Sequence, residues 1–141
     1  MQRIHEIKSN LLHYRAEYDS DQKVIYICWE GLSHLDSIVE LFKKMMAFMR
    51  THQVIGIVQN GEQMKGTFIK ANKFIGEQVI PFFDKCGVKY NIGGFTMDVF
   101  TRFSLEQLLK IINTKVELNF FKSFAEAKTY IEGKMNVKLA W

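Results

Sequence analysis

The stretch from Val54 to Thr67 constrains the fold most, because a short apolar run there leads into a polar segment that contains glycine. The run from Val54 to Val58 is typical of a central strand that is covered on both faces. Gln59, Asn60, Gly61 and Glu62 then predict a turn, and a helix is expected to begin near Gly66 and Thr67. Ligands and partners of open α/β sheets bind beyond the carboxyl ends of the strands, so we expect function near this turn.

A hairpin precedes this strand. The segments Leu11 to Tyr18 and Lys23 to Trp29 are separated by Asp19-Ser20-Asp21-Gln22, whose Asp and Ser side chains favour a turn. Two strands joined by so tight a turn must be antiparallel. The second strand is apolar at every position from Val24 to Trp29, which places it at or near the centre of the sheet.

Helix signals follow several of these strands. Ser33 to Asp36 has the Ser-x-x-acid form of a capping box, and the apolar stripe behind it predicts a helix to Met49. The next helix is expected to end at Gly87, and Pro81 predicts a kink or a break in it near residues 77–80.

The second half of the chain continues the alternation. Val88 to Ile92 predicts a short strand that runs into a flexible turn at Gly93-Gly94. Thr96 and Ser104 are expected to cap two short helices. A last strand spans residues 116–121, and Ser123 opens a helix that ends at Gly133, whereas the tail 135–141 has no predicted partner.

This order predicts an α/β protein with a mixed sheet of about five strands, the first of them antiparallel, and four or five helices. With 141 residues and no linker or repeat, residues 1–141 are expected to form one domain with a core from about residue 11 to residue 134.

Composition excludes several classes. The 19 Lys and Arg residues are scattered and only four more numerous than Asp and Glu, which argues against binding of nucleic acid. No apolar run approaches the roughly 18 residues of a membrane span, and the first residues lack the apolar core of a signal peptide. These two absences predict a cytoplasmic location. Cys28 and Cys86 lack metal-ligand spacing, so we expect them to be buried, reduced thiols.

Several short motifs occur at the junctions of these elements: Tyr18-Asp19, Ile27-Cys28-Trp29-Glu30-Gly31, Val79-Ile80-Pro81-Phe82-Phe83 with Gly87, and the closing stretch from Asn119 to Lys128. With them, residues 11–134 resemble the SpoIIAA-like superfamily of STAS-type domains, especially the small stand-alone STAS-like proteins of Bacteroidetes. The resemblance implies a SpoIIAA-like fold and a non-catalytic regulatory module that binds another protein.

One departure bears on regulation. In anti-anti-sigma factors of this superfamily, a serine in an Asp-Ser motif after the third strand is phosphorylated. The matching segment here, Gln59 to Glu62, has no Asp-Ser, and the nearest hydroxyl is that of Thr67. This difference argues against a phosphorylation switch.

The expected interaction surface combines three turns that follow parallel strands: Trp29 to Ser33, Gln59 to Thr67 and Gly93 to Met97. Its candidate residues are Trp29, Gly31, Ser33, Gln59, Asn60, Gly61, Glu62, Thr67, Gly93 and Gly94.

Two alternatives stay open. The Met-rich helix that begins at Ser33 can line a pocket for a small apolar or lipid-like ligand between the sheet and the helices, as in the similar CRAL-TRIO type of fold. The strand Leu11 to Tyr18, if it lies at an edge, can pair with its copy in a homodimer, although Arg15 and Glu17 oppose this.

No residue set predicts catalysis, a metal site or a cofactor: the four histidines are unpaired and the glycines form no phosphate-binding motif.

Overall fold

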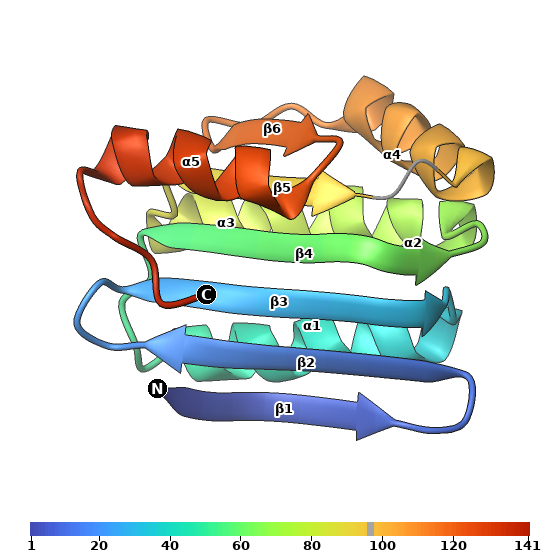
Figure 1. Ribbon diagram of the computed structural model, residues 1–141, viewed down its shortest axis with the longest axis horizontal. Coiled ribbons are helices and arrows are strands. Elements are labelled where there is room, and N and C mark those ends of the chain that lie inside the picture. The colour runs from blue at the N-terminus through green and yellow to red at the C-terminus, as the bar shows by residue number, and fades with distance from the viewer. Residues whose placement is uncertain (96–97) are drawn as a thin grey trace.

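The computed structural model describes residues 1–95 and 98–141, and its centre is one mixed sheet (Figure 1). The strands are β1 (Gln2–Lys8), β2 (Leu12–Asp19), β3 (Val24–Leu32), β4 (Gly56–Lys65), β5 (Tyr90–Phe95) and β6 (Glu117–Phe121). Their order in the sheet is their order in the chain. The first three strands are antiparallel and the pairs from β3 to β6 are parallel, so the predicted mixed α/β class is confirmed.

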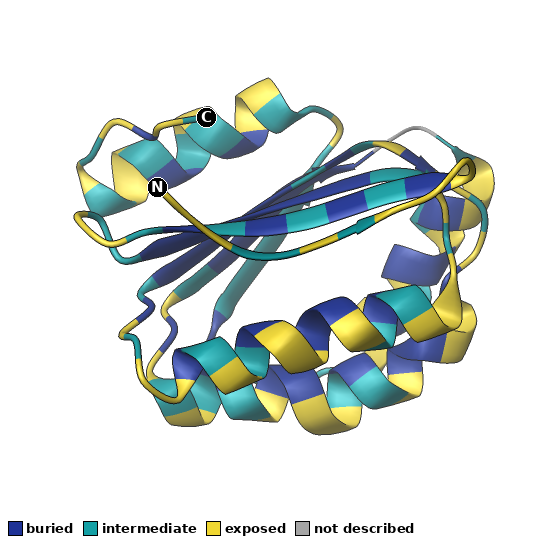
Figure 2. Ribbon diagram, turned by 90° about the horizontal axis from the view of Figure 1, so that it is seen from below, coloured by how far each residue is buried: buried dark blue, intermediate teal, exposed yellow. Residues whose placement is uncertain are grey.

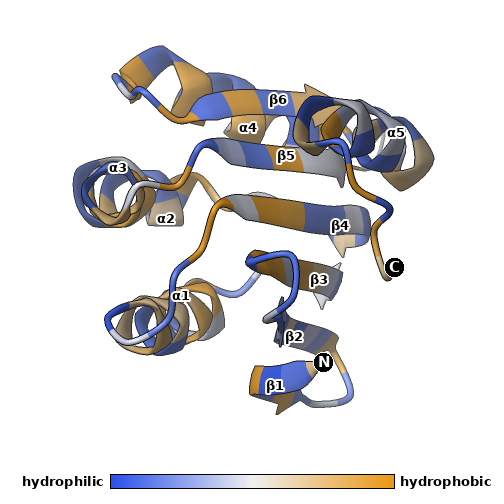
Figure 3. Cartoon of the chain, turned by 90° about the vertical axis from the view of Figure 1, so that its left-hand side faces the viewer, coloured by the Kyte–Doolittle hydropathy of each residue, from blue (hydrophilic) through white to orange (hydrophobic). Residues whose placement is uncertain are grey.

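Helices cover both faces of this sheet (Figure 3). The helices are α1 (Leu35–Met49), α2 (Ile69–Phe74), the π-helical turn η1 (Ile75–Val79), α3 (Ile80–Cys86), α4 (Val99–Ile111) and α5 (Phe124–Met135). α1, α2 and α3 lie on one face, and α4 joins them through contacts with α2 and η1. α5 lies on the opposite face. In the described ranges no helix has the length and apolar character needed to cross a membrane.

β1 is a strand that the sequence does not predict. Its seven residues include only two isoleucines, and a bulge between Arg3 and His5 interrupts the alternation of its faces. β1 pairs with β2 along residues 13–18. The strand Leu11 to Tyr18 is therefore flanked on both sides, so the edge position that pairing with its own copy requires is absent. Whether the chain forms a homodimer stays a prediction.

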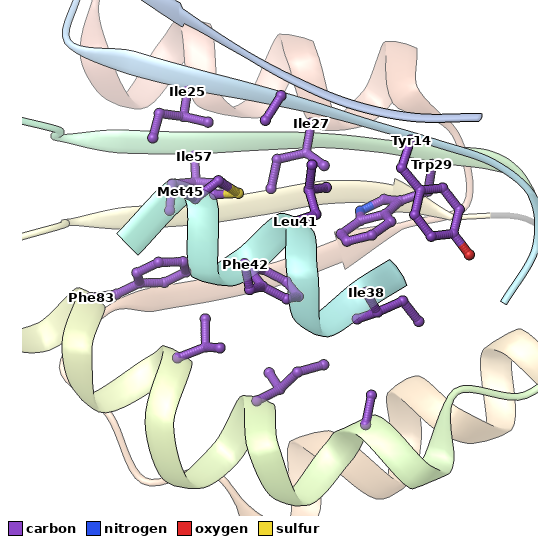
Figure 4. Close-up of a cluster of buried hydrophobic side chains, with 14 of the residues drawn as sticks. Tyr14, Ile25, Ile27, Trp29, Ile38, Leu41, Phe42, Met45, Ile57 and Phe83 are labelled. Carbon is purple, nitrogen blue, oxygen red and sulfur yellow. The ribbon is translucent and has the colours of Figure 1, made fainter. Parts of the chain in front are cut away.

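The sheet separates two apolar cores. The larger one lies between the sheet and α1 to α4, and it includes Ile27, Trp29, Met45 and Phe83 (Figure 4). The smaller one lies under α5 and includes Val24 and Tyr26 of the same strand. Figure 2 shows the buried sides of the helices turned toward the sheet on each face. Both faces of β3 are thus covered, which confirms its predicted central position.

The helix boundaries reflect local capping. α1 begins one residue later than predicted, because His34 is the N-cap and its Nδ1 accepts the Ser37 N–H at 3.3 Å. The Ser33 hydroxyl donates instead to the Lys65 carbonyl at 3.0 Å, so the expected Ser33 cap is wrong. Ser123 does cap α5, since its Oγ accepts the Glu126 N–H at 3.2 Å.

The segment around Pro81 confirms the predicted irregularity. Pro81 stands in the first turn of α3, directly after the π-helical turn η1. A π turn before proline tolerates the loss of the backbone N–H that proline lacks. The turn also rotates the residues that follow it around the helix axis. The fully buried side chain is consequently Phe83, whereas its neighbour Phe82 is only half-buried. Gly87 ends α3 in the left-handed conformation, as predicted.

The region after β5 differs from its prediction. A single helix, α4, is present instead of the two expected short ones. Asp98 is its N-cap, because its Oδ2 accepts a hydrogen bond from the Thr101 N–H at 3.0 Å. Ser104 lies inside α4, where its Oγ donates to the Phe100 carbonyl at 2.9 Å. It is therefore not a helix cap. The expected cap Thr96 lies outside the described residues.

The C-terminal tail docks on the α5 side of the sheet. The Trp141 ring stacks on Tyr26 with a centroid distance of 5.0 Å, and the guanidinium of Arg15 lies 5.3 Å from the Trp141 ring centroid. The Ala140 N–H donates to the Tyr26 hydroxyl at 3.0 Å. The tail thus covers part of β2 and β3 that α5 leaves open.

Candidate functional site

Three polar side chains form a buried chain of hydrogen bonds across neighbouring strands. Trp29 of β3 donates from Nε1 to Gln59 Oε1 at 2.9 Å, and Gln59 of β4 donates from Nε2 to Asn91 Oδ1 of β5 at 2.7 Å. Gln59 is 6% exposed and Asn91 is 3% exposed. The chain runs along the face of the sheet that carries the larger core.

The strand pairing brings these residues together. Gln59 stands opposite Ile27 on one side and Gly93 on the other, so Trp29 and Asn91 are each two residues along a neighbouring strand. Residues two apart on a strand share a face. The three side chains consequently project from one surface, where Trp29 also packs edge-on against Tyr14 with centroids 4.9 Å apart (Figure 4).

A small cavity lies beside this chain. It has a volume of about 50 Å³ and lies between the sheet and the helices of the larger core. Its walls combine the three polar residues with apolar side chains from the sheet, from α1, η1, α3 and α4, and from the segments that connect these elements, among them Phe42, Phe68, Phe95 and Leu108. Polar and apolar groups thus meet in this hollow of the larger core.

Glycines in the strands make room for the groups around the cavity. A Cβ on Gly61 would overlap the Phe95 ring, and one on Gly93 would lie 2.7 Å from Phe95 Cε2. The ring of Phe95 therefore lies directly on the backbone of β4 and β5. On the other face, a Cβ on Gly94 would overlap the backbone of Ser123. These glycines let a side chain or another stretch of backbone come close to the strand backbone, which is a known role of glycine in strands.

The predicted turns at these positions are therefore wrong. Gln59, Asn60, Gly61 and Glu62 lie inside β4, which runs on to Lys65, and Gly93-Gly94 lie inside β5. Asn-Gly and Gly-Gly pairs resemble turn residues locally, but here both backbones pair in parallel with their neighbours.

Burial divides the predicted interaction residues. Trp29, Gln59, Gly61, Gly93 and Gly94 are buried, so they offer no side chain to a partner in this structure. Of the predicted turn from Gly93 to Met97, residues 96 and 97 lie outside the described residues.

Three of the remaining predicted residues, Gly31, Ser33 and Thr67, do lie at the carboxyl edge of the sheet. Thr67 is exposed, while Gly31 and Ser33 are half-buried beside it on the neighbouring strand end. Ser33 joins these two strand ends, since its N–H donates to the Lys65 carbonyl at 2.8 Å. Asn60 and Glu62 are half-buried within β4.

Glu62 has a structural partner. Its Oε1 accepts the Phe124 N–H at 2.7 Å, and Phe124 is the first residue of α5. A carboxylate at a helix N-terminus satisfies a free amide and complements the helix dipole. Glu62 thus helps to hold α5 on the sheet.

A second polar cluster ties α4 to the end of β4. Asp98 Oδ2 accepts the Gly66 N–H at 3.2 Å, and the Thr101 hydroxyl donates to the Gly66 carbonyl at 2.9 Å. The Thr67 and Ser104 hydroxyls lie 3.0 Å apart. Hydrogen bonds from Thr101 lower the pKa of Asp98 below its usual value of 3.8. This cluster fixes the start of α4 at the carboxyl edge.

The first two turns of α4 expose large apolar side chains, which the sequence analysis did not single out. Val99 is 69% exposed, Phe100 62% and Phe103 50%. Leu32, Leu35 and Ile69 are exposed at the ends of neighbouring elements that meet the same edge. We call these six residues the edge patch. A signal was present in the sequence, because residues 99–112 are apolar on more than one side of the helix.

Neither cysteine has the character of a nucleophile. Burial, together with the hydrogen bond from its thiol to Glu30 at 3.3 Å, raises the pKa of Cys28 to about 12. Burial also raises the pKa of Cys86. Within residues 1–95 and 98–141, no three His, Cys, Asp or Glu side chains gather as a metal site requires.

Comparison with known proteins finds a distant similarity to a solved structure. No family model and no curated protein matches the chain. Among solved structures, the chain is similar to the crystal structure of an antisigma-factor antagonist, a STAS domain from Rhodobacter sphaeroides. The identity is 11%, the TM-score is 0.33, and the match covers 85% of this chain and 95% of that chain. At this TM-score, the observed sheet topology is what defines the fold.

Proposed function

We propose that this protein is a non-catalytic interaction domain and that a protein partner binds the edge patch. The observation that carries the proposal is the exposure of Val99, Phe100 and Phe103 in the first two turns of α4. Contiguous exposed apolar side chains of this size are typical of interaction sites, whereas single exposed ones are common on any surface.

The topology supports one continuous surface. Leu35, Ile69 and Val99 each stand at the first residue of a helix that follows a parallel strand. α2 contacts both α1 and α4, so these three helix starts lie in a row at the carboxyl edge of the sheet (Figure 1). The predicted residues Ser33 and Thr67 lie at the same edge, shortly before α1 and α2, and would form part of the polar rim that surrounds the apolar centre of an interface.

The hydrogen bonds of Asp98 and Thr101 support a preformed surface. They fix the start of α4 to Gly66 before any partner binds. A surface that is already ordered loses less conformational entropy on binding, which favours its use as a docking site.

The test compares two ends of the same helix. Phe100→Ser and Phe103→Ser remove apolar contacts from the edge patch, and Ile111→Ser is the matched control, because Ile111 is 58% exposed at the far end of α4. A protein captured by the intact chain from a lysate of its own host is purified, and its affinity is measured for each variant by calorimetry. We expect Phe100→Ser to weaken binding at least tenfold and Ile111→Ser to change it less than twofold.

Two results contradict the proposal: equal affinity for the intact chain and Phe100→Ser, or an equal loss in Ile111→Ser. Light scattering on the purified chain covers the case in which the partner is a second copy. A mass of two chains that falls to one in Phe100→Ser would identify that copy as the occupant of the edge patch.

A further inference from the structure

The cavity beside the Trp29–Gln59–Asn91 chain contains a hydrogen-bond donor without a protein partner. An indole N–H can only donate, so Gln59 must turn its Oε1 toward Trp29 and its Nε2 toward Asn91. Asn91 then accepts with Oδ1, and its Nδ2 is left at the end of the chain. Among the described residues, none accepts a hydrogen bond from Asn91 Nδ2.

This donor belongs to a side chain that lines the cavity and is 97% buried, given its exposed fraction of 3%. A buried amide without a partner costs roughly 1–3 kcal/mol. Natural proteins rarely keep such a group without a use for it or a bound molecule that satisfies it. The amide therefore indicates what the cavity accepts.

The walls restrict the class of ligand. Apart from Trp29, Gln59 and Asn91, the described lining residues are all apolar, and none carries a charge. A charged group in such surroundings would be desolvated without a counter-ion, which is strongly unfavourable. The remaining class is a neutral molecule with an apolar body and one acceptor oxygen.

The volume restricts the size. One water molecule needs roughly 10–15 Å³ of such space, so a cavity of about 50 Å³ holds a group of about four or five heavy atoms. Water alone would satisfy the amide but would leave the apolar walls hydrated. A small apolar molecule with one acceptor oxygen accepts the hydrogen bond of the amide and also contacts the apolar side chains of the walls.

We propose that this cavity is a binding site for a small neutral carbonyl compound, whose oxygen accepts a hydrogen bond from Asn91 Nδ2 while its carbon atoms contact the apolar walls. The site is narrower than a lipid pocket. It is also separate from the edge patch, so its occupancy does not depend on the proposed protein interaction.

The test uses 2-butanone as the probe, with 2-methyl-1-butene as its matched hydrocarbon, because a CH2 group there replaces the oxygen. Each is titrated into the full chain, and the side-chain amide signals of Asn91 and Gln59 are followed by ¹H–¹⁵N NMR. We expect 2-butanone to shift the Asn91 signals in a saturable way and the hydrocarbon to bind at least tenfold more weakly.

Three variants complete the design. Asn91→Leu removes the donor, and binding of 2-butanone should weaken at least tenfold. Asn119→Leu makes the same change on β6, outside the cavity lining, and should leave binding within twofold. Leu108→Phe fills the cavity but keeps Asn91, and it should abolish binding of both probes. If Asn91→Leu does not fold, Leu108→Phe still tests whether the probes bind in this cavity.

Any of three results would overturn the inference. One is no shift with 2-butanone, together with exchange signals that show only water beside the Asn91 amide. Another is equal binding of the ketone and the hydrocarbon. The third is binding that persists unchanged in Asn91→Leu or in Leu108→Phe.

Discussion

Gln59 Nε2 donates to Asn91 Oδ1 at 2.7 Å, and through this bond two amides from neighbouring parallel strands form a polar row inside an apolar core. Such a row fixes the relative register of its strands, because its members meet only when β4 and β5 are correctly aligned. It also makes the core sensitive to the loss of any single member, since the others are then unpaired.

A double-mutant cycle measures this dependence. Trp29→Phe leaves Gln59 Oε1 unpaired, and Gln59→Leu leaves the indole N–H unpaired, so each single variant should lose stability. The double variant removes both groups, and its loss should be smaller than the sum of the two by about 1 kcal/mol. Urea unfolding followed by circular dichroism provides the measurement, and strict additivity would contradict the coupling.

Two glycines near α5 should respond in opposite ways to alanine. A Cβ on Gly94 would overlap the backbone of Ser123, which cannot move without displacing α5, so Gly94→Ala should destabilise the fold by about 1–3 kcal/mol. Gly133 lies within α5 with no atom near its Cβ position, so Gly133→Ala should stabilise it by about 0.5–1 kcal/mol. Thermal unfolding of both variants checks the signs.

Asp98 gives stability a defined dependence on pH. Its pKa is lowered in the folded protein, first by the hydrogen bond from the Thr101 N–H, so the folded state favours the charged carboxylate. The contribution is therefore complete above the usual pKa of 3.8 and is lost as the pH falls through the lower folded value. We expect Asp98→Asn, which can still cap α4, to show a shallower loss of stability below pH 4. Equal slopes in urea titrations of both proteins would contradict this.

The two thiols should differ in reactivity. Cys28 is buried with a pKa of about 12, so it carries almost no thiolate at pH 8, whereas Cys86 is only half-buried. We expect a thiol reagent such as iodoacetamide to modify Cys86 first and Cys28 only on unfolding. Peptide mass spectrometry identifies the modified residue, and Cys86→Ser provides the control that should stay unlabelled in its native state.

Much of the fold follows from local signals. The hairpin turn is an example, because Asp19 Oδ1 accepts the Asp21 N–H at 3.0 Å, as its side-chain chemistry predicts. The same holds for the Ser123 cap, the Gly87 end of α3 and the irregular helix before Pro81. Each of these features depends on residues that are adjacent in the sequence.

The two wrongly predicted turns have a common physical origin. Asn60-Gly61 and Gly93-Gly94 carry the local chemistry of turns, but their conformation is set by contacts with distant residues. Phe95 needs Gly61 and Gly93 for its ring, and the start of α5 needs Gly94. A glycine that permits a turn and a glycine that permits close packing look the same in a sequence.

The candidate site was only partly accessible to prediction. From the sequence, Trp29 and Gln59 are expected to lie together, because both stand near the ends of strands that should be parallel neighbours, but they are expected at the surface. Asn91 was missed, since a single Asn between apolar residues is an ordinary exposed strand position. The exposed residues of α4 were missed because Val99 and Phe100 lie in a region where two short helices were expected, and their exposure depends on how the single helix α4 packs.

The order of strands in the sheet also bears on how the chain assembles. Every strand from β2 onward pairs with the strand synthesised immediately before it, so no strand has to be inserted between two earlier ones. A chain emerging from the ribosome can first form the antiparallel strands β1 to β3. It can then add β4, β5 and β6 one at a time, each after its connecting helices, to the same edge of the sheet. Assembly can thus proceed in the direction of translation, with the newest strand always serving as the template for the next.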